Sequence, residues 1–215
     1  MIRPTKQKSS PRRPAGFDLS RFDTPQELVV APFVDKLPRL LENSEGAPVH
    51  VYTQVGDDTL SYRIATGPDG LEVKGEANGR AFRLSMEPDA TELTGELPGG
   101  EVSLGLQGEF EADTFVLRET GHIGELKIEE TTRFAPDSTT VKGVIEGVEH
   151  QGHLDEGSRW TGQIGDQEYE QQLIPVENGL VAVGTFAGEP FSQWALKEPV
   201  DFTAPPVPEN SRSRS

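Results

Sequence analysis

Apolar residues recur from residue 49 onward in a pattern that repeats about every twenty residues. When one position in each unit is taken as an anchor, successive anchors are separated by 22, 20, 24, 24, 19 and 22 residues. An apolar residue stands two positions before each anchor, and residues that tolerate a positive φ stand four positions after most of them. The pattern predicts seven β-hairpins in tandem, with the hairpin repeats spanning residues 49–196. The anchors are Thr53, Gly75, Gly95, Glu119, Gly143, Gly162 and Gly184.

Apolar positions keep one parity before each turn and the matching parity after it, which places them on one face of the paired strands. The other face carries charged and polar residues. "ANGR" at 77–80 and "PGGE" at 98–101 are typical hairpin turns. We therefore expect an all-β, mainly antiparallel fold of about fourteen strands, each of roughly six residues.

A sheet of this size with one apolar face must curl, close into a barrel or cover that face. The repeat glycines fall on the apolar face, where they permit strong coiling of the strands or the close approach of a helix or ligand. We expect a curled or barrel-like sheet. The repeat glycines are Gly75, Gly95, Gly143, Gly162 and Gly184.

One segment before the repeats is typical of a helix. Thr24 is a candidate N-cap, Pro25 suits the first helical position, and Glu27 completes a capping box. Pro32 and Pro38 predict a kink or two short pieces. We expect a helical segment over residues 25–42 that packs on the sheet or inside it. Its apolar stripe is Val29, Phe33, Leu37, Leu40 and Leu41.

The two ends of the chain are rich in Pro, Ser and charge and lack periodicity. Residues 1–17 predict a disordered basic tail and residues 199–215 a disordered C-terminal tail. Residues 18–198 then form a single β-hairpin-repeat domain.

The units from Thr139 to Leu196 have an apolar or aromatic residue two before a glycine, as in Val141 with Gly143 and Trp160 with Gly162. An apolar residue follows two after the glycine, and the turn often carries glycine. In these features they resemble MORN repeats, whose hairpins stack into an elongated, curled sheet. The tyrosine usual two before the anchor is absent. The resemblance implies a scaffold that binds proteins or membrane surfaces through its groove, without chemistry of its own.

Charge limits the class of partner. The net charge is −16, although residues 1–21 hold six Lys or Arg and one acid, so the remainder is strongly acidic. An acidic body repels phosphate, which argues against nucleic-acid binding by the folded part. There is no cysteine and no apolar run long enough to span a bilayer. We expect a soluble, cytoplasmic protein without a cofactor.

The stretch "TTVKGVIEGVEHQGHL" at residues 139–154 is the strongest candidate for a catalytic or metal site, because His150 and His153 lie near several acids in the sequence. In the hairpin register His150 falls on the apolar face, where its counterparts are Phe82, Tyr169 and Phe191. His153 falls on the polar face, so the two imidazoles do not share a metal on a regular strand. His150 is therefore only a weak catalytic candidate, and no metal site is predicted. His50 falls on the polar face and His122 in a turn.

The two tryptophans differ in their predicted positions. Trp160 falls in an apolar column, whereas Trp194 falls on the polar face. An exposed tryptophan favours a contact surface, so both are interaction candidates.

Three functional hypotheses follow. The leading one is a non-enzymatic interaction or structural protein that binds a protein partner or associates with itself. The second is a carrier whose closed sheet holds a lipid or another small apolar ligand. The third is a hydrolase or lyase that uses His150 with a nearby Glu or Asp.

Overall fold

The computed structural model describes residues 47–98 and 100–199, and this part of the chain consists of fourteen β-strands. Their number confirms the seven predicted hairpins, but their lengths run from six to twelve residues. The predicted helical segment 25–42 and both predicted tails, apart from Pro199, lie outside the described residues. The strands are β1 Val49–Val55, β2 Asp58–Gly67, β3 Gly70–Ala77, β4 Arg80–Met86, β5 Glu92–Leu97, β6 Gly100–Glu111, β7 Thr114–Ile123, β8 Leu126–Phe134, β9 Thr139–Ile145, β10 Val148–Leu154, β11 Arg159–Ile164, β12 Gln167–Val176, β13 Gly179–Phe186 and β14 Glu189–Leu196.

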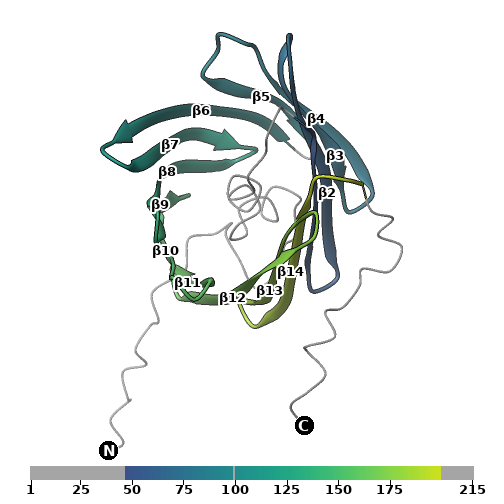
Figure 1. Cartoon of the computed structure of the whole chain (residues 1–215). Helices are drawn as coiled ribbons and strands as arrows, with labels where there is room; N and C mark the ends of the chain where they lie inside the picture. Colours follow the sequence, from purple (N-terminus) through teal and green to yellow (C-terminus); the bar gives the residue numbers. More distant parts are fainter. Residues whose placement is uncertain (1–46, 99, 200–215) are drawn as a thin grey trace, which may run out of the picture.

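The sheet closes into a barrel (Figure 1). Each strand pairs antiparallel with its neighbours in sequence, and β1 pairs with β14 to close the ring, with Val51 opposite Ala195. Closure leaves the sheet without an unpaired edge. This is the closed form of the predicted curled or barrel-like sheet.

Strict alternation separates the two faces. In β1 the residues Val49, Val51, Thr53 and Val55 are buried, while the residues between them are only partly buried. The buried set faces the lumen, where apolar side chains from all around the ring form one core cluster. The outer face is largely charged, with ion pairs such as Lys74 to Glu72. No helix in the described part of the chain is long and apolar enough to cross a membrane.

Two-residue turns fix the register of several hairpins. Asn78 and Gly79 have φ of 49° and 72°, and Glu146 and Gly147 have φ of 47° and 77°. Two positive φ values in succession match the twist of the flanking strands, as in a type I′ turn. The turn predicted at residues 77–80 is thus confirmed.

The repeat glycines lie where neighbouring strands come too close for a side chain. A Cβ built on Gly75 would sit 2.1 Å from the carbonyl oxygen of Ser61, and one on Gly184 would sit 1.9 Å from that of Glu170. Gly95, Gly143 and Gly162 each meet a neighbouring carbonyl oxygen at 2.3 Å. The column of glycines therefore allows the strands to coil tightly around the lumen.

A second apolar cluster lies on the outer face over β12, β13, β14 and β1. Its buried members are Val181, Trp194 and Leu196, with Tyr52, Ile174 and Val183 against them. Trp194 faces outward as predicted, but only 8% of it is exposed.

Candidate functional site

Polar side chains gather on the lumen wall formed by β7 to β14 and β1. Glu119 on β7 lies opposite Glu130 on β8, Gly143 on β9 follows, and His150 on β10 lies opposite Gly143. Both glutamates and the histidine are buried. Because Gly143 has no side chain, Glu130 and His150 meet across β9. The lumen wall formed by β2 to β6 is apolar by contrast, with residues such as Leu60, Phe82 and Leu104.

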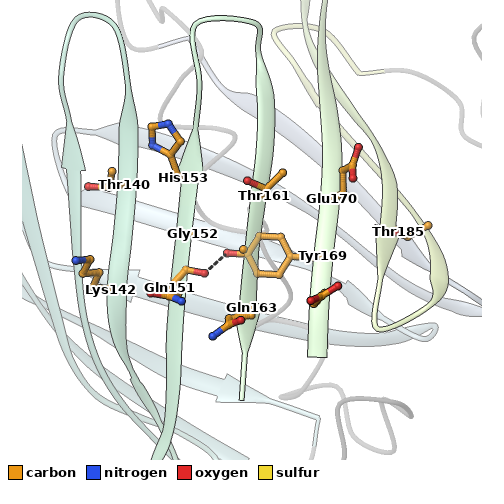
Figure 2. Close-up of a pocket in the computed structure, with 12 residues that line it drawn as sticks. Thr140, Lys142, Gln151, Gly152, His153, Thr161, Gln163, Tyr169, Glu170 and Thr185 are labelled. Atoms are coloured by element: carbon orange, nitrogen blue, oxygen red, sulfur yellow. Dashed lines mark hydrogen bonds between the residues drawn. The ribbon is translucent and has the colours of Figure 1, made fainter. Parts of the chain in front are cut away.

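His150 is held between an acid and a phenol. Its Nδ1 lies 2.7 Å from Glu130 Oε2, and its Nε2 lies 3.1 Å from the Tyr169 hydroxyl oxygen. That hydroxyl donates to the backbone carbonyl of Gln151 at 3.2 Å, the bond drawn in Figure 2. The hydroxyl has one hydrogen, so when it serves Gln151 the contact with Nε2 needs a hydrogen on His150. Glu130, His150, Tyr169 and the Gln151 carbonyl thus form a continuous series of hydrogen-bonding contacts along the wall.

Glycines make room for the Tyr169 ring. A Cβ on Gly152 would sit 2.1 Å from the Tyr169 hydroxyl oxygen, and one on Gly162 would sit 2.3 Å from it. Trp160 stacks on the same ring, with centroids 6.4 Å apart and an interplanar angle of 18°. The ring therefore lies flat against the wall, and its hydroxyl reaches His150 two strands away.

Two glutamines and a threonine form a second polar group on this wall. Gln193 Nε2 donates to Thr53 Oγ1 at 2.9 Å. Gln171 faces the lumen on β12 and is fully buried, yet within the described part of the chain neither its amide nitrogen nor its amide oxygen has a hydrogen-bond partner. Between the two glutamines, β13 presents only Ala182 and Gly184 to the lumen. We call this small-residue strip, with Gln171 and Gln193 at its borders, the amide trough.

A hollow of about 640 Å³ lies on the outside of β9 to β13 (Figure 2). Three threonines, two glutamines, His153 and charged residues line it, and Tyr169 lies beneath. Arg159 donates to Glu170 in the hollow at 2.9 Å, and this bond lowers the pKa of Glu170. Ligand pockets are usually lined by apolar side chains with few polar groups, which describes the lumen better than this hollow.

The predicted site residues fall mostly where the register placed them. His150 lies in the lumen with 6% exposed, whereas His153 is exposed on the outer face, so the two do not converge. Among the described residues no three His, Cys, Asp or Glu side chains form a metal cluster. The prediction that His122 lies in a turn is wrong, because β7 runs through it to Ile123. Trp160 is buried in the core, and its role and that of Trp194 as contact residues remain predictions.

The sequence reasoning missed the buried acids and Gln171. Glu119 is the one charged residue in the anchor column, and Glu130 stands eleven residues after it, on the parity of the apolar face. Gln171 stands nine residues after its anchor, also on that parity. A polar residue in an apolar column is therefore the sequence signal that Glu119, Glu130 and Gln171 share with His150.

Comparison with models of protein families, with curated proteins and with solved structures finds no match to this chain.

Proposed function

We propose that the barrel is a carrier that binds an elongated, mainly apolar small molecule in its lumen. The bound molecule has a polar end that both donates and accepts hydrogen bonds, and this end lies in the amide trough against Gln171. The barrel form and the apolar lumen wall of β2 to β6 support a site for the apolar part.

The observation that carries the proposal is Gln171. Its side chain is fully buried and both amide atoms lack a partner among the described residues. A buried polar group without a partner costs about 1–3 kcal/mol, so an orphaned amide calls for a ligand or water that completes it. A molecule offering one donor and one acceptor, such as a primary amide, satisfies both atoms.

The neighbouring residues explain why the polar end would settle there. Ala182 and Gly184 leave the trough without bulky side chains, and Gln193 borders it on the far side with its amide nitrogen already bonded to Thr53. Apolar residues such as Leu173 and Phe191 flank the trough on the same wall. The trough therefore combines two side-chain amides with apolar surroundings, the usual composition of a ligand pocket.

The test is native mass spectrometry of the full chain mixed with oleamide, an apolar chain that ends in a primary amide. Gln171→Leu removes the orphaned amide, and Gln163→Leu removes an exposed glutamine of the outer face as a matched control. We expect the wild-type and Gln163→Leu proteins to retain oleamide and Gln171→Leu to lose at least tenfold in affinity. Equal retention by all three proteins, or retention by none, would contradict the proposal.

A further inference from the structure

Although the ring closes, one of its strands extends beyond its neighbour. β6 has twelve residues and pairs with β7 from Val102 to Glu111. β5 has only six residues, and the pairing of β6 with β5 ends at Gly105. The hairpin of β6 and β7 therefore projects past the end of β5 (Figure 1). On that side, residues 107–111 of β6 have no paired strand in the described part of the chain.

The projecting part of β6 leaves backbone groups unpaired. In an antiparallel ladder, the N–H and C=O groups of successive residues point to opposite neighbours. Leu106 donates its N–H to the carbonyl of Thr91, just before β5, at 2.6 Å, so the even-numbered residues of β6 point to the β5 side. The N–H and C=O groups of Gly108 and Phe110 therefore point to the open side, where no described residue bonds them. Such an edge is a template for another strand.

An exposed aromatic ring lies on this edge. Phe110 is 76% exposed, the largest exposed fraction among the large hydrophobic residues of the described chain. Its ring centroid lies 5.2 Å from that of Phe115 on β7, and Phe115 in turn stacks on Phe134 of β8 at 6.1 Å. The three rings form an apolar strip across β8, β7 and β6 that ends uncovered at the open edge. A residue of an added strand beside Phe110 would extend this strip.

The other face of the same edge is acidic. Glu109 and Glu111 alternate with Phe110 along β6, and both are exposed. Their ion-pair partners, Arg118 and Arg133, lie on β7 and β8, the side of β6 away from the open edge. A strand added to the edge therefore meets the two carboxylates before it meets these cations. The net charge of −16 adds to the attraction for positive charge.

We propose that residues 107–111 of β6 bind an extended segment of a partner protein by strand addition, and that this segment alternates apolar and basic residues. Its backbone pairs with Gly108 and Phe110, its apolar side chains pack on the Phe110 ring, and its basic side chains lie beside Glu109 and Glu111. In this mode of recognition the main-chain bonds give affinity and the alternate side chains give specificity. The inference goes beyond the carrier function and uses no residue of the amide trough.

A second copy of this chain fits the edge less well than a basic segment. In a symmetric antiparallel pair centred on Glu109, this residue lies opposite its own copy. Like charges opposite one another destabilise paired strands, and two bodies of charge −16 repel. Charged residues on an edge are a common means of preventing pairing between identical copies. Basic residues on the added strand turn this repulsion into attraction.

Amide hydrogen exchange of the full chain tests the backbone pairing. The probe is the synthetic peptide KVKVKVK, and the control is EVEVEVE, which has the opposite charge. With KVKVKVK we expect the amide protons of Gly108 and Phe110 to exchange at least tenfold more slowly. The amide proton of Glu109, which points to β7, should keep its rate.

Three outcomes overturn the proposal. The first is an unchanged exchange rate at Gly108 and Phe110 with KVKVKVK, and the second is equal slowing with EVEVEVE. The third is slowing that grows with protein concentration in the absence of peptide, because it shows that the edge pairs with a second copy.

A second measurement separates binding at the edge from general attraction to an acidic surface. Phe110→Ser removes the exposed ring, whereas Val144→Ser removes a 37% exposed apolar residue from β9, which is paired on both sides. By fluorescence anisotropy of labelled KVKVKVK, we expect at least fivefold weaker binding to Phe110→Ser and unchanged binding to Val144→Ser. Equal affinity of both variants and the wild type overturns the proposal. Neither measurement bears on oleamide retention, which tests the carrier function separately.

Discussion

His150 and Glu130 form a buried pair across β9, with Nδ1 and Oε2 2.7 Å apart and about 5% of each side chain exposed. Their strands, β8 and β10, are not neighbours in the ring. The two side chains meet because Gly143, which lies between them on β9, has no side chain. The pair is therefore a product of the barrel register.

Removing one partner of this pair should lower the free energy of unfolding more than replacing both partners with apolar residues. His150→Phe leaves the Glu130 carboxylate buried without its imidazole, so we expect a loss of about 3–5 kcal/mol in the free energy of unfolding. The double variant Glu130→Leu with His150→Phe should lose less than the sum of the single variants. Urea unfolding followed by circular dichroism gives the cycle. Additive losses would show that the two side chains act independently. If His150 supported a hydrolase or lyase, a folded His150→Phe variant would also lack that activity.

Alanine substitution should destabilise the barrel at a glycine that is in close contact with a neighbouring strand, and not at a glycine with open space around it. A Cβ on Gly162 would collide with the Gln151 carbonyl oxygen and the Tyr169 hydroxyl oxygen, each at 2.3 Å, whereas a Cβ on Gly67 has nothing within 4 Å. We expect Gly162→Ala to cost at least about 1–3 kcal/mol, because backbone and ring must shift. Gly67→Ala should be neutral or stabilise by up to about 1 kcal/mol. Thermal melts of the two variants compare them directly, and similar melting temperatures would contradict the close packing of Tyr169.

His50 should make the barrel sensitive to mild acid. Burial, and then the charge of Arg63 opposite it, lower the pKa of His50 below 6.5. A histidine with a lowered folded-state pKa contributes stability that is fully present above the unfolded pKa and is lost as the pH falls through the folded one. We expect His50→Gln to reduce the loss of stability on going from about pH 7.5 to pH 5. An unchanged pH profile would rule out this contribution.

Trp194 should behave as a core residue although it faces outward. It lies opposite Val181 on β13 and Tyr52 on β1, within the outer apolar cluster. We expect Trp194→Ala to cost about 3–5 kcal/mol, as for a buried aromatic residue. Ser192→Ala, on the same face of the same strand, should change stability by less than about 0.5 kcal/mol. Chemical denaturation of both variants tests this. Native stability of the Trp194→Ala variant would contradict a core role and would favour the prediction that Trp194 is a contact residue.

Much of the fold follows from local pattern. The seven hairpins and the two faces could be predicted because strand periodicity, turn residues and small anchor residues repeat in each unit. Closure could only be given as an alternative to curling, since the pairing of Val51 with Ala195 joins the two ends of the repeat region.

The site was less predictable, because it depends on which lumen residues become neighbours. Parity places Glu130, His150 and Gln171 on the inner face, but it does not say that Gly143 lets the first two bond. Nor does parity show that both amide atoms of Gln171 lack a hydrogen-bond partner among the described residues. The burial of Trp194 likewise depends on the outer apolar cluster around it rather than on its strand alone.

The proposed carrier function depends most directly on the side-chain amide of Gln171. Nitrogen–proton NMR spectra identify its two amide protons as the pair missing from Gln171→Leu. On titration with oleamide we expect this pair to shift and the Gln163 pair to stay unchanged, while methyl oleate, which accepts but does not donate a hydrogen bond, gives a smaller shift. A Gln171 amide pair whose chemical shifts do not change at saturating oleamide would contradict the carrier function.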